Sequence, residues 1–344
     1  VYCTLYNSAD SSEEMKTVKE TIEGEISEDS SIEVNKITCK VVKMAAVTMK
    51  KSKGDVSGSF TSDAIRNAPD ILFENLASVF RSWLYHGTVT RSLLACAFMP
   101  LLKNSMKDPA ETKSYRAIAG SSLWLKLFKR VVLTVWGQQL ASGSLQMGYK
   151  KKSSTAQCSY AMMETVRYFL DNGSNPIMVA LDMSSAFDKC GFDILFFKLQ
   201  GRLPAIVIRT LMFIYQQQHA WVKWGSSSNS SMFNISNGTR QGSVLSPALF
   251  SIYVQDLLDE LQALGVGCHV GGTFLGAIAW ADDFLLLAPN RASMQQMLDL
   301  AADFGLRNNL EVSCDPDPVK IKSKAIFMLG KKTTLVKPVN LLYG

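Results

Sequence analysis

FLGAIAWADDFLLLA, residues 274–288, places two adjacent carboxylates, Asp282 and Asp283, between two apolar runs. Each run has the length and apolar character of a strand in a sheet, so the stretch predicts strands over 274–280 and 284–287 that form a hairpin. The simplest reason for the acidic pair is a hairpin tip that needs turn-forming residues. Tips more often carry Asn-Gly or Asp-Gly, however, and neighbouring carboxylates repel each other unless a cation lies between them. The stretch therefore predicts either a plain hairpin tip or a cation site.

A further carboxylate stands at the end of another apolar run, PIMVALDMSSAFD, residues 176–188. The run predicts a strand over 177–181 that ends in Asp182 and then turns into a helix. A lone Asp in this position most often caps the helix that follows. Carboxylates gathered at strand ends also suit Mg²⁺, and two such ions ~3.5–4 Å apart stabilise the attacking and leaving oxygens of a phosphoryl transfer. Only folding can unite Asp182 with Asp282, because they lie far apart in the sequence.

A glycine-punctuated loop, SNGTRQGSVLSPALF, covers residues 236–250 and leads into a predicted helix. Ser246 is the expected N-cap and Pro247 the first helical residue. Gly238 and Gly242 permit a ligand to approach the backbone, while the loop's arginine and glutamine side chains add hydrogen-bond donors. Taken alone, the loop also fits an ordinary helix entry.

In this chain order, the three segments resemble the motif set of reverse transcriptases. LDMSSAFDK (residues 181–189) resembles the first catalytic motif, NGTRQGSVLSP (237–247) the substrate-positioning loop, and AWADD (279–283) the catalytic hairpin. The longer stretch NGTRQGSVLSPALFSIYVQDL (237–257) is most similar to the LINE-type (non-LTR) retrotransposon branch. The resemblance covers roughly residues 60–329. It implies an RNA-directed DNA polymerase that adds dNTPs to a primer 3′-hydroxyl by two-metal phosphoryl transfer.

The resemblance also implies roles for individual residues. Asp182 and Asp282 would be the principal catalytic metal ligands and Asp283 an auxiliary carboxylate, with two Mg²⁺ ions, or Mn²⁺, as the cofactor. Phe187 would be the steric gate that collides with a ribose 2′-hydroxyl. Trp280 stands where the family usually has tyrosine.

Further segments, outside the three motifs above, resemble motifs that contact the substrate in this family. FMPLLK (98–103) and SYRAI (114–118) are similar to fingers motifs whose lysine and arginine hold the incoming triphosphate, and KIKSKAIF (320–327) is similar to a late palm motif whose lysine lies near the departing pyrophosphate. The residues carried over as substrate-binding are Lys103, Arg116, Phe187, Arg240, Gln241, Gly242 and Lys322.

The expected fold class is α+β: a right-hand polymerase palm, built as an antiparallel sheet with packed helices, plus helical or mixed fingers, with the thumb largely missing. The expected domains are an N-terminal extension (1–60), fingers and palm (61–330), and the start of a truncated thumb or linker (331–344). Within the extension, an acidic stretch over 7–33 is expected to be a mobile surface segment, and a basic stretch over 36–53 is either an arm that neutralises phosphates or a solvated helix face. Periodicity predicts helices over 72–84, 123–140, 156–170, 205–218, 248–261 and 292–304, and strands over 177–181, 221–224, 274–280, 284–287 and 325–329.

The amino-acid composition is typical of a globular protein. The chain has 344 residues, a formal charge of +6, 47% hydrophobic and 19% charged residues, and seven cysteines in no metal-ligand spacing. The weakly polar run 264–281 holds a histidine and several glycines, so it makes a poor membrane helix, and no membrane partner is expected. The expected partners are an RNA template, a DNA primer and dNTPs; the alternative is a decayed or truncated fragment that binds nucleic acid without catalysis.

Overall fold

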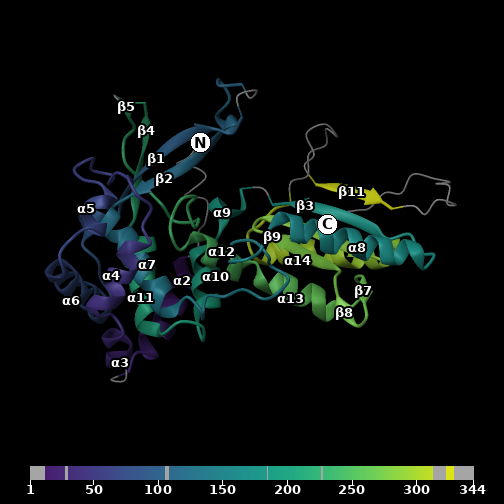
Figure 1. Cartoon of the computed structure of the whole chain (residues 1–344), viewed down its shortest axis with the longest axis horizontal. Helices are drawn as coiled ribbons and strands as arrows, with labels where there is room; N and C mark the ends of the chain where they lie inside the picture. The colour runs from purple at the N-terminus through teal and green to yellow at the C-terminus, as the bar shows by residue number, and fades with distance from the viewer. Residues whose placement is uncertain are drawn as a thin grey trace. The chain divides into compact units, whose positions relative to one another are not determined.

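The computed structural model describes residues 12–27, 30–104, 108–183, 185–225, 228–312 and 323–328. The chain divides into two compact units, each made of two stretches of sequence. Unit 1 comprises residues 1–141 and 187–249, and unit 2 comprises residues 142–186 and 250–344. Of the three boundaries, the one after residue 141 lies outside any helix, and the other two fall within α9 (Ala186–Lys189) and α12 (Ser246–Tyr253). Figure 1 labels the elements of both units.

Unit 1 is mainly helical, and its helices bury one apolar face each. Phe80 and Trp83 of α6 (Asp70–His86) each make an edge-on contact with Phe128 of α7 (Leu123–Trp136), with ring centroids 5.3 Å apart. Gly87 ends α6 in the left-handed conformation, with φ 64°, as the sequence predicts for a helix stop. The helices of unit 1 are α2 (Ser12–Gly24), α3 (Ser30–Asn35), α4 (Cys39–Val47), α5 (Ser62–Arg66), α6 (Asp70–His86), α7 (Leu123–Trp136), α10 (Phe192–Leu199) and α11 (Ala205–Gln216), with short 3₁₀ turns η1 (Arg91–Leu93) and η2 (Thr112–Ser114).

A mixed sheet completes unit 1. Its strand order is β2-β1-β4-β5, with β6 also paired to β4. β1 and β2 are antiparallel, whereas β1 and β4 are parallel. The strands are β1 (Ala95–Leu102), β2 (Tyr115–Ser121), β4 (His219–Trp224), β5 (Ser228–Asn229) and β6 (Phe233–Asn234). The helix and strand periodicities did not predict β1 or β2, although both lie in the segments that resemble fingers motifs.

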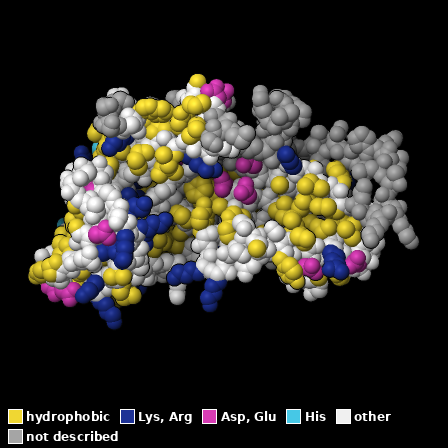
Figure 2. Space-filling model, turned by 45° about the horizontal axis from the view of Figure 1, so that its top comes forward, with side chains coloured by type: hydrophobic (Ala, Val, Ile, Leu, Met, Phe, Trp, Pro, Cys, Tyr) yellow, Lys and Arg dark blue, Asp and Glu magenta, His cyan; other side chains and the backbone are white. Residues whose placement is uncertain are grey.

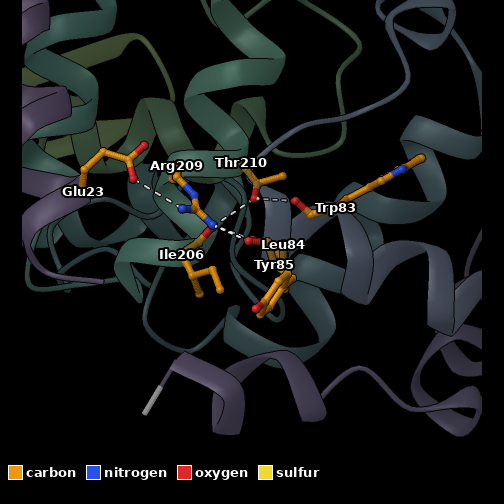
Figure 3. A network of polar contacts seen from close by, with 7 residues as sticks. All are labelled: Glu23, Trp83, Leu84, Tyr85, Ile206, Arg209 and Thr210. Atoms are coloured by element: carbon orange, nitrogen blue, oxygen red, sulfur yellow. Dashed lines mark hydrogen bonds and ion pairs between the residues drawn. The ribbon is translucent and has the colours of Figure 1, made fainter. Parts of the chain in front are cut away.

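The acidic N-terminal stretch contains a packed helix, where the sequence favoured a mobile surface segment. Met15, Val18 and Ile22 of α2 are buried. At the end of α2, Glu23 forms an ion pair with Arg209 of α11 at 3.3 Å. The same guanidinium donates to the carbonyls of Leu84 and Tyr85 at the end of α6, at 3.1 and 2.8 Å (Figure 3). Apolar residues at helical spacing, rather than net charge, therefore decide the conformation of this stretch.

Unit 2 is built on an antiparallel sheet with strand order β11-β3-β10-β9. This pairing confirms the predicted hairpin over 274–288 and places β3, the strand that ends in Asp182, directly beside it. The first run of the hairpin is divided between a short ribbon and β9. The strands are β3 (Ile177–Asp182), β7 (His269–Val270), β8 (Thr273–Phe274), β9 (Ala277–Trp280), β10 (Asp283–Ala288) and β11 (Lys324–Phe327).

Helices pack on both faces of this sheet. α13 (Gln255–Leu264) contacts β9 and α14 (Arg291–Arg307) contacts β10 on one face. On the other face, Met162, Val166 and Phe169 of α8 (Thr155–Asp171) pack against a core cluster of Met178, Cys268 and Leu287. Figure 1 shows α8 running along the sheet within this unit. The helix predicted over 248–261 is two helices, α12 and α13, which divide at Val254, the N-cap residue of α13. None of the described helices combines the length and the apolar character that crossing a bilayer requires.

Candidate active site

The sheet of unit 2 brings two of the predicted carboxylates together. In the antiparallel pairing of β3 with β10, Asp182 is the direct partner of Asp283. Side chains of directly opposed residues project from the same face of a sheet, with Cβ atoms about 4.5–5.5 Å apart. The strand register therefore creates a carboxylate pair from residues that are distant in sequence. Asp282 precedes β10 in the turn and is half-buried.

The turn between β9 and β10 is tight and has an unusual backbone. Ala281 adopts φ 60°, in the left-handed region that alanine rarely occupies. Asp283 pairs with Trp280 as well as with Asp182, so the hairpin closes through only Ala281 and Asp282. The favoured two-residue hairpin loops have a positive φ at the first loop residue, which here is Ala281. The acidic pair is thus a hairpin tip, as one reading of the sequence predicts, and Asp283 is at the same time a cross-strand neighbour of Asp182.

A pocket of about 270 Å³ lies beside this pair, entirely within unit 2. Its lining combines the two carboxylates with apolar side chains of the sheet and with residues of the first turns of α8. Tyr160 and Met163, farther along α8, are 68% and 64% exposed, and apolar side chains gather over this part of unit 2 in Figure 2. The pocket residues that bear on the site are Asp182, Asp283, Trp280, Cys158, Ser159 and Met162.

Tyr149 responds to the negative charge of the site. Burial raises the pKa of its phenol, and the charges of Asp282 and Asp283 raise it further, to about 12. A phenolate next to two carboxylates is disfavoured by like-charge repulsion, so Tyr149 stays protonated up to a higher pH than an ordinary tyrosine. This shift indicates that Asp282 and Asp283, which we call the acidic turn, face the same region as Tyr149.

The donor set fits a hard cation such as Mg²⁺. Carboxylate oxygens are its preferred protein ligands, and the Asp182–Asp283 pair supplies two of them from one face of the sheet. Across the described ranges of the chain, no group of three or more Asp, Glu, His or Cys side chains is placed so that it could hold a metal ion. Mg²⁺ is commonly bound by one or two carboxylates, with water and substrate phosphates completing its shell. The open arrangement is therefore compatible with a substrate-assisted metal site.

In unit 1, the glycine-punctuated loop is fixed by backbone hydrogen bonds on two sides. The Ala119 N–H of β2 donates to the Gln241 carbonyl at 2.9 Å, and the Thr239 N–H donates to the Phe187 carbonyl at 2.7 Å. Gly242 adopts φ 96°, and a Cβ there would lie 3.3 Å from the Ala119 carbonyl oxygen. The loop is therefore held between β2 and Phe187 of the first catalytic motif.

Arg240 and the loop glutamine lie in different environments. Arg240 is only 1% exposed, and its guanidinium nitrogens have no hydrogen-bond partner among the described residues. Buried Lys129 lies nearby, with its ammonium 5.0 Å from the centre of the Tyr215 ring. Burial lowers the pKa of Lys129 well below its ordinary value, and the charge of Arg240 lowers it further. Gln241 is half-buried and Gly242 is exposed, so these two, rather than the Arg240 side chain, lie at the surface of the loop.

The two predicted triphosphate contacts lie on one hairpin of unit 1. Arg116 of β2 is the cross-strand partner of Leu101 in β1, and the Lys103 N–H donates to the Ser114 carbonyl at 2.8 Å, which continues the ladder. Arg116 therefore lies in the hairpin ladder, and Lys103 directly follows the end of β1. Both side chains are exposed.

The remaining predicted residues differ in what the structure says of them. Phe187 is buried, with 8% of its surface exposed, at the start of unit 1's second stretch. Lys322 lies outside the described residues, although β11 begins two residues later and pairs with β3. Trp224 is 54% exposed and makes an edge-on contact with Tyr115, so it belongs to the surface of its sheet.

Sequence reasoning missed the segment 145–150, which contacts the acidic turn. Gln146 is fully buried, and Gly148 lies against the turn backbone. The signal for it is the order Gln-x-Gly-Tyr just before a lysine triplet and a capping box at Ser154 and Gln157. No periodicity marks such a segment, because its pairing with β9 is a single bridge.

The chain is similar to a known family over most of its length. Residues 102–330 match the family described as reverse transcriptase (RNA-dependent DNA polymerase). Among curated proteins, it is 24% identical to the Retrovirus-related Pol polyprotein from type-1 retrotransposable element R2 of Nasonia vitripennis, over 75% of this chain and 25% of that protein. It is also 24% identical to the RNA-directed DNA polymerase from mobile element jockey of Drosophila melanogaster, over 82% of this chain and 30% of that protein.

A further relative is the Retrovirus-related Pol polyprotein from type-2 retrotransposable element R2DM of Drosophila melanogaster, 23% identical over 81% of this chain and 26% of that protein. The chain thus spans about a quarter to three tenths of the length of these curated relatives.

Proposed function

Because the chain belongs to the reverse transcriptase (RNA-dependent DNA polymerase) family, we propose that it is the polymerase domain of a LINE-type retrotransposon protein and extends a DNA primer on an RNA template. The observation that carries the proposal is the register of β3 with β10, which pairs Asp182 with Asp283 beside the acidic turn. These residues belong to the motifs that resemble the family's catalytic ones. They also lie within the residues that match the family.

Asp182, Asp282 and Asp283 are the carboxylates that would hold the metal in this proposal. When bound, Mg²⁺ supplies positive charge that stabilises the attacking and leaving oxygens of an in-line phosphoryl transfer. The protein's own part is positioning, because phosphoryl transfer requires little covalent chemistry from side chains. The cross-strand pair keeps two carboxylates on one rigid face, and the neutral Tyr149 phenol adds no negative charge beside them.

We assign the antiparallel sheet of unit 2 to the polymerase palm and the β1–β2 hairpin of unit 1 to the fingers. The palm assignment is supported by the carboxylates at the strand ends and by the helices that pack on the sheet. The fingers assignment is supported by exposed Lys103 and Arg116 near the same end of the hairpin, where they would bind the triphosphate of an incoming dNTP.

The remaining substrate contacts follow from the loop and from Phe187. Gln241 and Gly242 would approach the nucleotide or template, while buried Arg240 supports the loop from within. Phe187 would exclude a 2′-hydroxyl, and Lys322 would lie near the departing pyrophosphate. The alternative, a nucleic-acid-binding fragment without catalysis, is not favoured by a family match that includes the motifs with all of the predicted carboxylates.

Primer extension tests the proposal. The parent protein is incubated with an RNA template, an annealed DNA primer, dNTPs and Mg²⁺, beside the variants Asp182→Asn and Asp283→Asn. Asp193→Asn, in α10 of unit 1, is a matched control because it removes a carboxylate outside the proposed metal ligands. We expect extension by the parent and by the control, and a loss of at least ~100-fold in both site variants. Extension that survives in Asp182→Asn would contradict the proposed metal site, and a folded parent without extension would contradict the function.

A further inference from the structure

The segment before α8 forms an added edge on the sheet of unit 2. The Ala279 N–H donates to the Leu145 carbonyl at 2.9 Å, and the Met147 N–H donates to the Ala279 carbonyl at 2.8 Å. Gln146 and Ala279 form an isolated parallel bridge. Residues 145–147 therefore lie alongside β9, immediately before the acidic turn.

The Gln146 side chain binds the turn itself. Its Oε1 accepts hydrogen bonds from the Ala281 N–H at 3.0 Å and from the Gly148 N–H at 2.9 Å. Its Nε2 donates to the Ala281 carbonyl at 3.1 Å. Gln146 has no exposed surface. One buried amide thus satisfies both backbone polar groups of the residue that precedes Asp282.

Ala281 needs this support because its backbone is strained. Its φ of 60° is unfavourable for a residue with a Cβ, and such conformations persist where surrounding contacts fix them. Gly148 adds a steric constraint from the same segment: a Cβ at Gly148 would lie 2.4 Å from the Ala281 nitrogen. The backbone of residues 146–148 and that of the turn are therefore in direct contact, with no room for a side chain between them.

We propose that Gln146 is a positioning residue for the acidic turn, which holds Ala281 in the left-handed conformation and thereby orients Asp282 and Asp283. Gln146 acts through the Ala281 backbone and contacts neither metal nor substrate. The inference rests on the proposed polymerase function and adds to it a residue from outside the motifs that carry the family resemblance. A glutamine meets the requirement because it carries a donor and an acceptor on one planar group, which Ala281 needs simultaneously.

A buried glutamine could also serve stability alone, so the test needs a matched control from the same unit. Gln255 provides it. Gln255 is 4% exposed, and its Oε1 accepts from the Gly143 N–H at 2.7 Å, while its Nε2 donates to Asp259 at 2.7 Å. It makes the same kind of buried amide contact to a loop backbone but does not bind the turn.

The experiment compares Gln146→Met with Gln255→Met in the full chain. Thermal unfolding measures the stability loss of each variant, and amide exchange at residues 279–283 measures protection of the turn. Mn²⁺ binding, followed by electron paramagnetic resonance, measures the carboxylate site without turnover. Steady-state primer extension separates kcat from the KM for dNTP. Gln146→Glu keeps the acceptor for the Ala281 and Gly148 amides and loses the donor, so it provides a second variant if Gln146→Met does not fold.

We expect Gln146→Met to accelerate exchange of the turn, to weaken Mn²⁺ binding by at least about five-fold and to lower kcat on the order of 10–100-fold, with a KM for dNTP within about two-fold of the parent. Gln255→Met should leave all of these near the parent at a comparable loss of stability, and Gln146→Glu should fall between them. Unchanged amide exchange at residues 279–283 in either Gln146 variant would overturn the proposal that Gln146 holds Ala281 in place. Altered exchange with Mn²⁺ binding and kcat equal to those of Gln255→Met would overturn the positioning role.

The outcome for the parent separates this inference from the proposed function. A folded parent that neither binds Mn²⁺ nor extends a primer contradicts the polymerase proposal itself. A working parent whose Gln146 and Gln255 variants behave alike contradicts the positioning role and leaves the polymerase proposal intact.

Discussion

Single residues report on the charge of the candidate site, and Tyr149 is the most direct reporter. Its pKa is raised to about 12, first by burial and then by the charges of Asp282 and Asp283. A cation bound at these carboxylates would offset their charge and make the phenolate less unfavourable. The same residue therefore senses both the acidic turn and any metal that binds there.

We expect Mg²⁺ to lower the pKa of Tyr149 and Asp282→Asn to lower it without metal, toward but not to its ordinary value of 10, because the burial contribution remains. Alkaline absorbance titration measures the phenolate. Subtracting the same titration of a Tyr149→Phe variant isolates this residue from the other tyrosines. A Tyr149 titration that is insensitive to both Mg²⁺ and Asp282→Asn would contradict the shared site.

Phe187 carries the second residue-level prediction. Its ring is buried, and its carbonyl accepts a hydrogen bond from the glycine-punctuated loop through Thr239. If Phe187 is the proposed steric gate, shortening its side chain with Phe187→Val opens space for a ribose 2′-hydroxyl. We expect the ratio of kcat/KM for rNTP to kcat/KM for dNTP to rise by about 10-fold or more, with dNTP use reduced less than this. An unchanged ratio in a folded variant would refute the steric-gate role.

At the level of elements, the start of α7 depends on a carboxylate from a distant turn. Asp55 accepts a hydrogen bond from the Leu123 N–H at 2.7 Å and another from the Ser57 hydroxyl. Burial alone would raise the pKa of Asp55, but these hydrogen bonds and the charge of Lys126 outweigh burial, so the pKa is lowered. The ionised carboxylate therefore binds better in the folded chain than in the unfolded one.

The sign of this shift determines the pH dependence. A carboxyl with a lowered folded pKa contributes stability above its unfolded pKa of about 3.9, and that contribution is lost as pH falls through the folded value. We expect Asp55→Asn to be less stable than the parent at pH 7 and to lose less stability on acidification below about pH 4. Urea unfolding at both pH values measures the difference. If the parent and the variant lose stability equally on acidification, the lowered pKa of Asp55 in the folded chain is contradicted.

At the level of the whole molecule, a single arginine joins the N-terminal helix to the rest of unit 1. The Arg209 guanidinium binds the α6 carbonyls of Leu84 and Tyr85 and also pairs with Glu23 of α2 (Figure 3). The Arg209 side chain is 20% exposed and its contact with the Leu84 carbonyl is partly buried, whereas the Glu23 side chain is 43% exposed. The two kinds of contact should therefore contribute unequally to stability.

We expect Arg209→Met to lower the free energy of unfolding by about 1–3 kcal/mol, because carbonyl groups at a helix end lose charge-assisted partners. Glu23→Gln should cost less than about 1 kcal/mol, since exposed ion pairs contribute little. Chemical denaturation of both variants measures this. A larger loss of unfolding free energy for Glu23→Gln than for Arg209→Met would contradict the expectation that the carbonyl contacts contribute more than the ion pair.

Local pattern was enough to predict much of the architecture. Helices α6, α7, α8, α11 and α14 and strands β3 and β10 lie where the apolar pattern of the sequence predicts them. Periodicity did not identify β1 and β2, whose pairing depends on partners far along the chain. The acidic N-terminal stretch likewise needed tertiary contacts, through Ile22 and Glu23, to show that it contains a packed helix.

The sequence by itself determined the family and supplied the candidate carboxylates, because the motifs resembling those of reverse transcriptases carry them in contiguous stretches that can be read one residue after another. Only the tertiary structure decided that Asp283 is the cross-strand partner of Asp182, that the Arg240 side chain is buried, and that Gln146 binds the Ala281 backbone. The physical reason is that register, burial and side-chain hydrogen bonds belong to pairs of segments. Gln146 and Ala281 are 135 residues apart, and no local pattern records which distant backbone a buried amide will meet.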